Sequence, residues 1–272
     1  MLIEALNFLS ARCEGKFKRF GYLHEAIAID ARFRRCKSAW KSHLENTKSE
    51  IVSAIDKTSK HAKVVVLGAG AGYDIPLDEL ERRFDRVVLV DVVFLRSIRK
   101  IAQKSSKITL VEADLTGLVD SLEDLSSDFD VKEIQSKPPV DLLDGADLVI
   151  SCNILSQLPI CIQNWLIKSG VDEDDGDLQK CCLKIITDHL KWVENADSSI
   201  LLITDLERRV EPVKVMEEGE IRDNALYGLK FNKLAANWIW DIAPSPEVDT
   251  AYHLKHLVGS VYLKHDDFFD IS

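Results

Sequence analysis

The feature that most constrains this chain is a glycine cluster between two short apolar runs. The first run is VVVL at 64–67, the cluster is GAGAG at 68–72, and the second run, VVLV at 87–90, ends on Asp91. Short β-branched and aliphatic runs of this kind are typical of parallel strands, which are buried on both faces. The spacing between the two runs accommodates one helix. We therefore predict a βαβ unit in which the glycines form the first strand-to-helix turn.

This turn has the chemistry of a ligand site. Glycines allow a tight turn and let a ligand approach the main chain closely. The helix that follows offers free N–H groups at its N-terminus, which suit an anionic group. Asp91 closes the second strand, where a carboxylate can accept hydrogen bonds from both hydroxyls of a ribose. The segment therefore predicts a ligand that contains a nucleoside.

The spacing of the glycines separates two kinds of cofactor. A dinucleotide fingerprint needs a third glycine three positions after the second, and Tyr73 stands there. An NAD-linked oxidoreductase is therefore the less favoured alternative. The pattern G-x-G-x-G followed by Asp91 instead resembles the first two motifs of the class I S-adenosylmethionine-dependent methyltransferases. VEADL at 111–115 resembles the end of that family's third strand, and DLVISCN at 147–153 resembles its fourth strand and the loop facing the methyl donor.

This resemblance, which covers about residues 64–204, implies a fold and a cofactor. The fold is α/β: a Rossmann-like sheet of seven strands with helices on both faces. The cofactor is S-adenosyl-L-methionine, with the ribose on Asp91 and the adenine amino group on Asp114, and no metal is implied. Val66 departs from the family, which often has Asp or Glu two residues before the first glycine. The implied cofactor-binding residues are Gly68, Ala69, Gly70, Gly72, Asp91, Val92, Asp114, Leu115 and Asn153.

The remaining elements follow from apolar periodicity and turn residues. We expect strands at 63–67, 87–91, 108–111, 146–151 and 199–204, helices at 78–84 and 178–193, and a helix that ends near 105. We expect residues 116–140 to form a helix and an exposed loop, and Asp74 to cap the first helix of the βαβ unit. Two alternating segments, 237–242 and 257–263, predict a final antiparallel pair.

Residues 1–60 differ from the rest of the chain in charge. They hold 12 Lys and Arg against 7 Asp and Glu, whereas residues 61–272 hold 23 against 38. Their apolar residues recur at helical spacing, and residues 23–46 are expected to form one long helix. We predict that 1–60 is a helical cap or lid and that 61–272 is the methyltransferase-like domain. The cap is either a solvated basic face or a lid that attracts an anionic acceptor to the strand ends.

The lid hypothesis supplies four candidates for substrate contacts. Arg35 and His43 are expected to turn inward, and the loop around Tyr22 and His24 is expected to close over the methyl group. No catalytic residue is predicted, because in-line methyl transfer relies mainly on holding the reacting groups in position.

Composition limits the partners of the chain. The 272 residues carry a formal charge of −10 with a pI near 5.2, which argues against nonspecific binding of nucleic acid. No apolar run approaches the roughly 20 residues of a membrane helix. The six cysteines form no C-x-x-C pair, which is typical of reduced thiols. We therefore expect a cytoplasmic protein.

The loop after the predicted fourth strand indicates the class of acceptor. Residues 153–155 read Asn-Ile-Leu, without the Pro-Pro-aromatic signature often found in methyltransferases that act on amino groups of bases. The Pro-Cys pair of cytosine C5 enzymes is also missing. We therefore expect a methyltransferase that acts on a small metabolite, with an anion as one candidate. The alternative from another class is a non-catalytic protein of the same fold that binds S-adenosylmethionine.

Overall fold

Five parallel strands form the centre of the computed structural model, which describes residues 13–123, 130–172, 176–214, 219–263 and 269–271. Val65 of β1 pairs with Val88 of β2 on one side and with Val149 of β4 on the other. The apolar runs are buried because both faces of the sheet are covered. The five strands, in spatial order, are β3 (Ile108–Glu112), β2 (Arg86–Asp91), β1 (Lys63–Leu67), β4 (Leu148–Cys152) and β5 (Ser199–Pro212).

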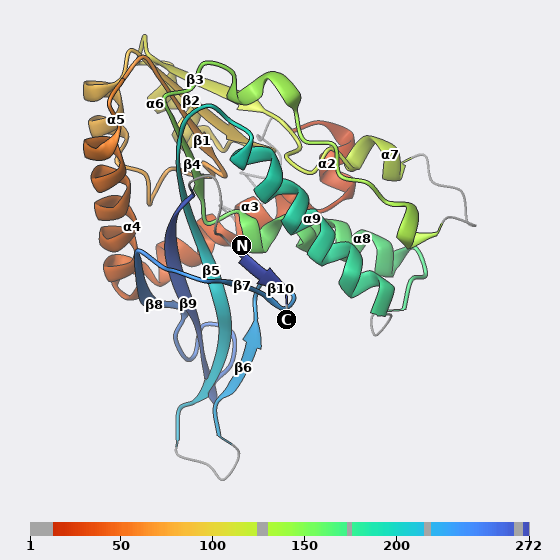
Figure 1. Ribbon diagram of the computed structural model, residues 1–272. Coiled ribbons are helices and arrows are strands. Elements are labelled where there is room, and N and C mark those ends of the chain that lie inside the picture. The colour runs from red at the N-terminus through yellow and green to blue at the C-terminus, as the bar shows by residue number, and fades with distance from the viewer. Residues whose placement is uncertain (1–12, 124–129, 173–175, 215–218, 264–268, 272) are drawn as a thin grey trace.

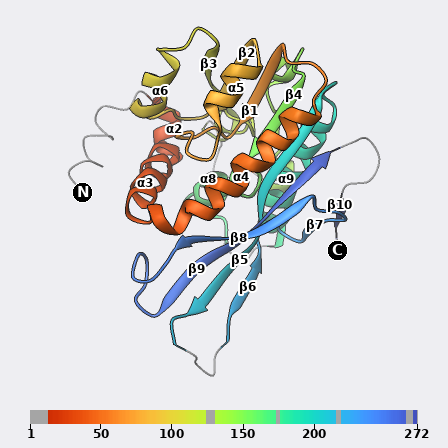
Figure 2. The same ribbon diagram turned by 90° about the vertical axis from the view of Figure 1, so that its left-hand side faces the viewer.

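Antiparallel strands continue the sheet beyond β5. The strand β9 (Tyr252–Leu263) lies between β5 and β8 (Ala236–Ala243) and runs against both, so the full order is β3-β2-β1-β4-β5-β9-β8. β6 (Ile221–Asn224) pairs with the outer half of β5. Figure 2 shows that these strands extend well beyond the parallel core. β7 (Leu229–Phe231) and β10 (Phe269–Ile271) form a separate small pair.

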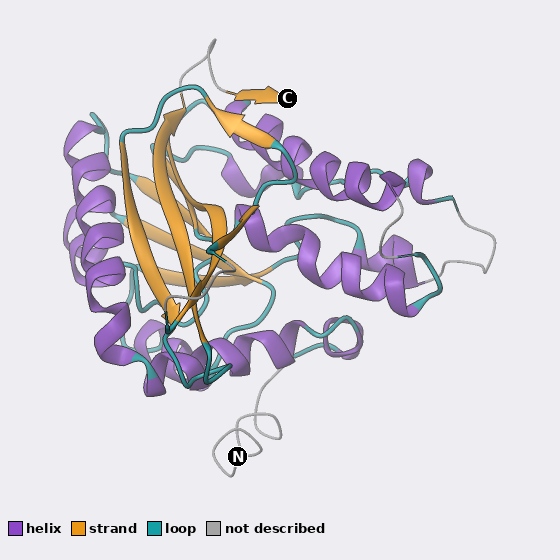
Figure 3. Ribbon diagram, turned by 90° about the horizontal axis from the view of Figure 1, so that it is seen from below, coloured by secondary structure: helices purple, strands orange, loops and turns teal. Residues whose placement is uncertain are grey.

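Helices cover both faces of the sheet, as Figures 1 and 3 show. Alternate residues of β1 point to opposite cores: Val65 packs into one and Val66 into the other. The Val66 side is covered by α4 (Lys37–Lys57), α5 (Leu77–Arg83) and α6 (Arg96–Ala102). The Val65 side is covered by α2 (Gly15–Arg19), α7 (Val119–Glu123), α8 (Leu158–Lys168) and α9 (Gly176–Glu194).

The helix α3 (Tyr22–Arg35) contributes to both cores. Its residues Leu23 and Ile27 pack with the Val65 side, while Ile29 and Phe33 pack against the Val66 side. Three short 3-10 segments complete the connections: Val131–Glu133, Val140–Leu143 and Leu155–Gln157. No helix in the described part of the chain combines the length and the apolarity that crossing a membrane requires.

The predicted fold class is confirmed, and two details differ from the prediction. The long helix expected at 23–46 is two helices, because Cys36 (φ −104°, ψ 21°) leaves helical geometry and α4 turns towards β8. There Trp40 Nε1 donates to the Ile242 carbonyl at 2.9 Å. The fifth strand continues to Pro212 because β9 pairs along it. Of the expected helix and loop at 116–140, residues 124–129 lie outside the described residues, as do residues 1–12 of the predicted cap.

A histidine buried between α9 and β4 makes the fold sensitive to acid. His189 Nε2 lies 3.1 Å from Ser151 Oγ. Burial lowers the pKa of His189 to about 3, so the ring is neutral in the folded protein. In the unfolded chain an ordinary histidine has a pKa of about 6.5. The contribution of His189 to stability is therefore constant above about pH 6.5 and is lost as the pH falls towards 3.

We expect acid to narrow the stability difference between the wild type and His189→Gln. The difference in the free energy of unfolding should shrink by up to about 1.4 kcal/mol per pH unit below about pH 6. Urea unfolding of both proteins at several pH values measures this difference, and groups that titrate in both proteins cancel. A difference that stays constant down to about pH 4 would contradict the buried, neutral state of His189.

Candidate functional site

A cavity of about 320 Å³ lies at the carboxyl ends of the parallel strands. One part of its wall comes from the loops after β1, β2, β3 and β4, and the rest comes from α3, α4, α8, β5, β8 and β9. Ligands of open α/β sheets bind at this edge, because polar groups can face solvent only where the buried strands end. The cavity has the size of a small-molecule site.

The glycine loop after β1 forms the floor of this cavity. Gly68, Gly70 and Gly72 all have positive φ angles, of 77°, 48° and 74°. A Cβ on Gly68 would lie 2.5 Å from Ile154 Cβ, so packing alone requires glycine there. A Cβ on Gly70 would meet only Asp91 Oδ2, at 4.0 Å. Glycine at position 68 is therefore needed for packing against Ile154. Gly70 leaves free space on the cavity side of the loop.

Asp91 is fixed at the wall of the cavity by the loop it faces. Its Oδ2 accepts the Gly70 N–H at 2.7 Å, and its Oδ1 accepts the Val93 N–H at 3.4 Å. Burial raises the pKa of the Asp91 carboxyl, and the N–H groups of Gly70, Val93 and Val92 oppose that rise. Val92, the next residue along, also lines the cavity. The carboxylate is therefore held in one orientation beside the glycine loop.

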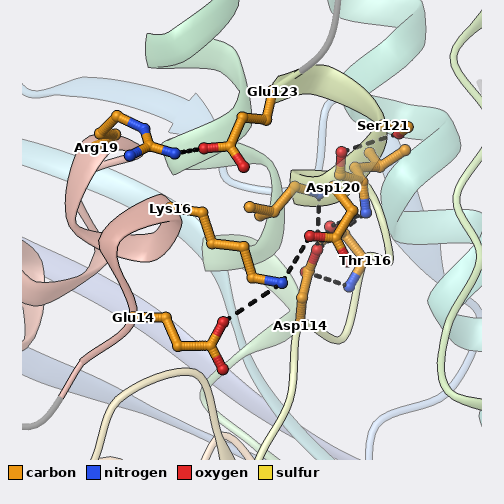
Figure 4. A network of polar contacts seen from close by, with 10 residues as sticks. Glu14, Lys16, Arg19, Asp114, Thr116, Asp120, Ser121 and Glu123 are labelled. Atoms are coloured by element: carbon orange, nitrogen blue, oxygen red, sulfur yellow. Dashed lines mark hydrogen bonds and ion pairs between the residues drawn. The ribbon is translucent and has the colours of Figure 1, made fainter.

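Asp114 lines the cavity beside Leu115, but the chain already occupies its carboxylate (Figure 4). Its Oδ1 accepts from the backbone and the hydroxyl of Thr116, at 2.9 and 2.7 Å. Its Oδ2 accepts the N–H groups of Leu118 and Val119, both at 2.9 Å. A carboxylate offers about four lone-pair sites. Asp114 therefore holds the turn into α7, and its contact with an adenine amino group stays a prediction.

Asp74 does not cap a helix, contrary to the prediction from the sequence. The helix α5 begins at Leu77, preceded by Pro76, and receives no side-chain cap. The carboxylate of Asp74 instead lines the cavity, where its Oδ2 accepts from Asn153 Nδ2 at 2.7 Å. Asn153 has a left-handed backbone (φ 51°) and its Oδ1 is buried without a partner. A non-glycine residue with positive φ beside a cavity is a frequent mark of a functional site.

The thiol of Cys152 is not a nucleophile in this environment. Burial, together with the neighbouring Asp74, raises the pKa of Cys152 well above its ordinary value. The thiolate is the reactive form of cysteine, and it is therefore disfavoured here.

Tyr73 attaches α3 to the glycine loop. Its hydroxyl donates to Asp30 of α3, and its ring stacks on Phe33 with a centroid distance of 3.7 Å. The residue that replaces the third glycine of a dinucleotide fingerprint thus has a structural partner in the N-terminal helices. This contact places α3 over the strand ends, where its residues Tyr22, Ala26 and Ile29 line the cavity.

His43 is a buried, neutral member of the cavity wall. Its Nδ1 accepts the indole N–H of Trp238 at 3.1 Å, and its ring stacks on Trp240 with a centroid distance of 3.9 Å. Burial lowers the pKa of His43 to about 4, although Asp74 and Asp205 oppose that shift. Because Nδ1 accepts a hydrogen bond, the single proton of the neutral ring is on Nε2. His43 is therefore a hydrogen-bond donor at this wall.

Asp205 and His256 form a second polar pair at the same end of the cavity. His256 Nδ1 lies 3.1 Å from Asp205 Oδ2, and Ser156 Oγ donates to that same oxygen at 3.0 Å. Burial favours the neutral form of Asp205, but His256 and Ser156 outweigh it and lower the pKa of the carboxyl. Among the described residues, no group of three or more His, Cys, Asp or Glu has the arrangement of a metal site.

The structure separates the four predicted substrate contacts. Tyr22 and His43 line the cavity, and burial beside Asp114 raises the pKa of Tyr22 well above its ordinary value. His24 is exposed on the outer side of α3. Arg35 does not turn inward: its guanidinium contacts Glu247 through Nε and Nη2, at 3.0 and 2.6 Å. The break at Cys36 explains this, because Arg35 and His43 then lie on different helices.

Two residues of the cavity wall near Asp205 were not proposed from the sequence. His256 and Trp240 reach the cavity only because β9 runs antiparallel between β5 and β8. Asp205 directly follows the strand expected at 199–204. The antiparallel pair expected at 237–242 and 257–263 forms, but its second strand also pairs with β5, and that pairing brings His256 to Asp205.

Comparison with known proteins gives likenesses of fold only. No protein-family model matches the chain, and no curated protein matches it. One similar structure is the N-methyltransferase NodS from Bradyrhizobium japonicum WM9 in complex with S-adenosyl-L-homocysteine. It is 11% identical over 80% of this chain and 86% of that one, with a TM-score of 0.35.

Two further structures are similar to the same degree. The 1,6-didemethyltoxoflavin-N1-methyltransferase of Burkholderia thailandensis is 12% identical over 87% of this chain and 89% of that one, with a TM-score of 0.34. An S-adenosylmethionine-dependent methyltransferase of Leishmania major is 10% identical over 81% and 73%, with a TM-score of 0.33. The fold assignment rests on the strand order. Five parallel strands, followed by a reversed strand inserted before the last one, form the sheet of the class I methyltransferase fold.

We expect two neighbouring glycines of the loop to respond differently to a methyl group. Gly68→Ala should lower the free energy of unfolding by roughly 2 to 4 kcal/mol, from backbone strain and the collision with Ile154. Gly70→Ala should cost only about 1 kcal/mol, because the methyl group enters open space. Chemical denaturation of both variants beside the wild type measures the two losses, and equal losses would show that the loop is packed differently.

Proposed function

We propose that the protein is an S-adenosylmethionine-dependent methyltransferase acting on a small molecule. The observation that carries the proposal is the carboxylate of Asp91, held on the Gly70 N–H beside open space at the strand ends. This arrangement suits the two hydroxyls of a ribose, and the glycine loop admits the rest of the nucleoside close to the main chain. When bound, S-adenosylmethionine supplies an activated methyl group on a sulfonium.

The residues of the cavity fit such a cofactor at its other end as well. The acid that the family often carries two residues before the first glycine is Val66 here, and Val66 is fully buried. Asp74 offers a carboxylate at the cavity instead, with an amide for a neighbour and no cation paired with it among the described residues. A carboxylate in that setting suits the ammonium of the methionine part.

The walls of the cavity support a small acceptor. The helices α3 and α4 lie over the strand ends, and Trp40, Leu44 and Ile29 add apolar surface. Helices over a site limit the access of water to a methyl transfer, which suits a small acceptor. The alternative function is non-catalytic binding of the same cofactor. It predicts binding without turnover, so the experiment measures both.

We expect Asp91→Asn to weaken binding of S-adenosylhomocysteine by about 1.5 to 3 kcal/mol, the range for hydrogen bonds to a charged group. Isothermal titration calorimetry on the full chain measures the affinity. Asp188→Asn is the matched control, because Asp188 pairs with Lys184 on the surface of α9. Turnover is measured as release of S-adenosylhomocysteine from S-adenosylmethionine in the presence of a small-molecule cell extract. Wild-type affinity in Asp91→Asn would remove the ribose assignment, and binding without release would favour the non-catalytic alternative.

A second prediction isolates Asp74. Asp74→Asn should weaken the binding of S-adenosylhomocysteine, which carries an ammonium, about ten- to a hundredfold. It should leave the affinity for 5′-methylthioadenosine unchanged, because that compound lacks the amino-acid part. Calorimetry measures the affinity of each ligand for the wild type and for Asp74→Asn. General damage to the site would weaken the binding of both ligands equally. Equal weakening would contradict the assignment of Asp74.

A further inference from the structure

We call the part of the cavity wall made of His43, Asn153, Asp205 and His256 its polar end. These residues are not needed to bind the nucleoside. Asn153 follows the end of β4 and lies beside the middle of β5, where Asp205 is, since the Asn153 N–H donates to the Ile203 carbonyl at 2.8 Å. His43 comes from α4 and His256 from β9. These four residues all line the cavity. They therefore form the part of the wall that remains for a methyl acceptor.

An irregularity in the sheet places Asp205 at this wall. The register between β5 and β9 shifts between Asp205 and Glu207, which leaves Leu206 as an extra residue. A β-bulge of this kind redirects the side chains next to it. Asp205 is only 2% exposed, and its Oδ1 has no hydrogen-bond partner. A buried carboxylate oxygen beside a cavity is satisfied if the ligand brings a donor.

His256 presents one nitrogen to Asp205 and keeps the other available. Its Nδ1 faces Asp205 Oδ2 at 3.1 Å, while Nε2 has no partner among the described residues. Trp240 packs against the ring edge to face, with a centroid distance of 5.7 Å. A carboxylate beside one imidazole nitrogen fixes the tautomer and leaves the other nitrogen as a proton acceptor.

The charged groups around His256 come from three directions. Asp205 and Arg208 face it from β5, where Arg208 is its direct partner in the register. His43 of α4 and Asp74 of the glycine loop lie in the same cluster, and β8 presents the uncharged Trp240. Arg208 donates to the Ser156 carbonyl at 3.2 Å.

The cavity as a whole does not suit an anionic acceptor. Its described lining includes five carboxylates and two guanidinium groups. Arg208 donates a hydrogen bond to the Ser156 carbonyl, and Arg32 Nε lies 4.0 Å from Glu247 Oε1. The basic residue on which the expectation of an anion rested, Arg35, is paired with Glu247. A cavity with this excess of carboxylates attracts cations and hydrogen-bond donors.

On the basis of the proposed function, we propose that the acceptor is a primary amine and that His256 takes its proton, with Asp205 as the positioning residue. The polar end offers acceptors for several N–H groups: Asp205 Oδ1, Asn153 Oδ1 and His256 Nε2. A hydroxyl or thiol has only one hydrogen to give, whereas an alkylammonium has three.

The step balances in atoms and electrons. One N–H bond of the ammonium breaks, and its proton goes to His256 Nε2. The freed nitrogen lone pair then forms the bond to the methyl carbon, and the carbon–sulfur bond breaks with its electron pair going to sulfur. The products are a methylated ammonium, a neutral thioether and a protonated His256, and the ammonium and His256 together carry the two positive charges that the reactants brought. A positioned general base typically contributes about 10²- to 10⁴-fold to such a rate.

The test uses a small-molecule cell extract divided on a cation-exchange resin into an amine fraction and a flow-through. Release of S-adenosylhomocysteine by the full-length protein is measured with each fraction as the pH is raised from neutral to alkaline. We expect release with the amine fraction only. His256→Gln should lower kcat at neutral pH at least about a hundredfold. The kcat of this variant should rise towards the wild-type value at high pH, where the amine loses its proton to solvent. Its affinity for S-adenosylhomocysteine should equal that of the wild type.

Two variants complete the comparison. Asp205→Asn should lower kcat less than His256→Gln and displace the pH profile, because His256 remains but loses its charged partner. His253→Gln is the matched control on the same strand: His253 lies outside the cavity lining, and its Nδ1 accepts the Ser245 N–H, which glutamine can also do. It should keep the wild-type rate, and thermal unfolding of each variant checks the fold.

The outcomes separate the two proposals. Release with the flow-through rather than the amine fraction would overturn the acceptor class, and a wild-type rate in His256→Gln at neutral pH would overturn the base. In both cases the methyltransferase itself would stand. No release with either fraction, despite binding of S-adenosylhomocysteine, would overturn the proposed function and this inference with it.

Discussion

The burial of the central strands on both faces is the constraint on which the rest of the structure depends. Val64 to Leu67 in β1 are completely buried, so the strand has no room for polar chemistry along its length. The polar groups that line the cavity follow the ends of β1, β2, β3 and β4 or come from β5 where it continues past them. The glycine loop, Asp91 and Asn153 are close together for this reason alone. The packing of the core thereby determines where the chemistry takes place.

The N-terminal helices are part of the site rather than a layer beside it. Tyr73 holds α3 through Asp30 and Phe33, and Trp40 holds α4 through the Ile242 carbonyl. These contacts lie next to the cavity and connect its roof to both the glycine loop and the antiparallel strands. The roof and the floor are consequently coupled, because a shift of α3 would move Tyr73 and with it the loop. Of its basic residues, Arg35 pairs with Glu247 outside the cavity lining, whereas Arg32 lines the cavity.

The two ends of the cavity differ in the way their polar groups are satisfied. At the nucleoside end, Asp91 and Asp114 receive backbone N–H groups, which hold their carboxylates in fixed positions. At the polar end, Asp205 contacts His256 and Asn153 contacts Asp74, and Oδ1 of Asp205 and Oδ1 of Asn153 are left without a donor. Backbone hydrogen bonds suit a cofactor of constant shape, while unpaired side-chain acceptors suit a ligand that brings its own hydrogens.

The sequence by itself determined the βαβ unit, the glycine loop and the position of Asp91. These depend on local apolar runs and on residues adjacent in the chain, and such patterns can be recognised from the sequence alone. The same local logic failed at Cys36, where helical periodicity continues although the chain turns, and at Asp74, which was expected to cap a helix and instead lines the cavity. Only the tertiary structure decided the polar end. His43, Asp205 and His256 lie far apart in the sequence, and they meet because β9 pairs with β5 across a bulge and α4 packs on β8. Strand order and register depend on long-range packing, so no pattern within one segment could have brought these three residues together.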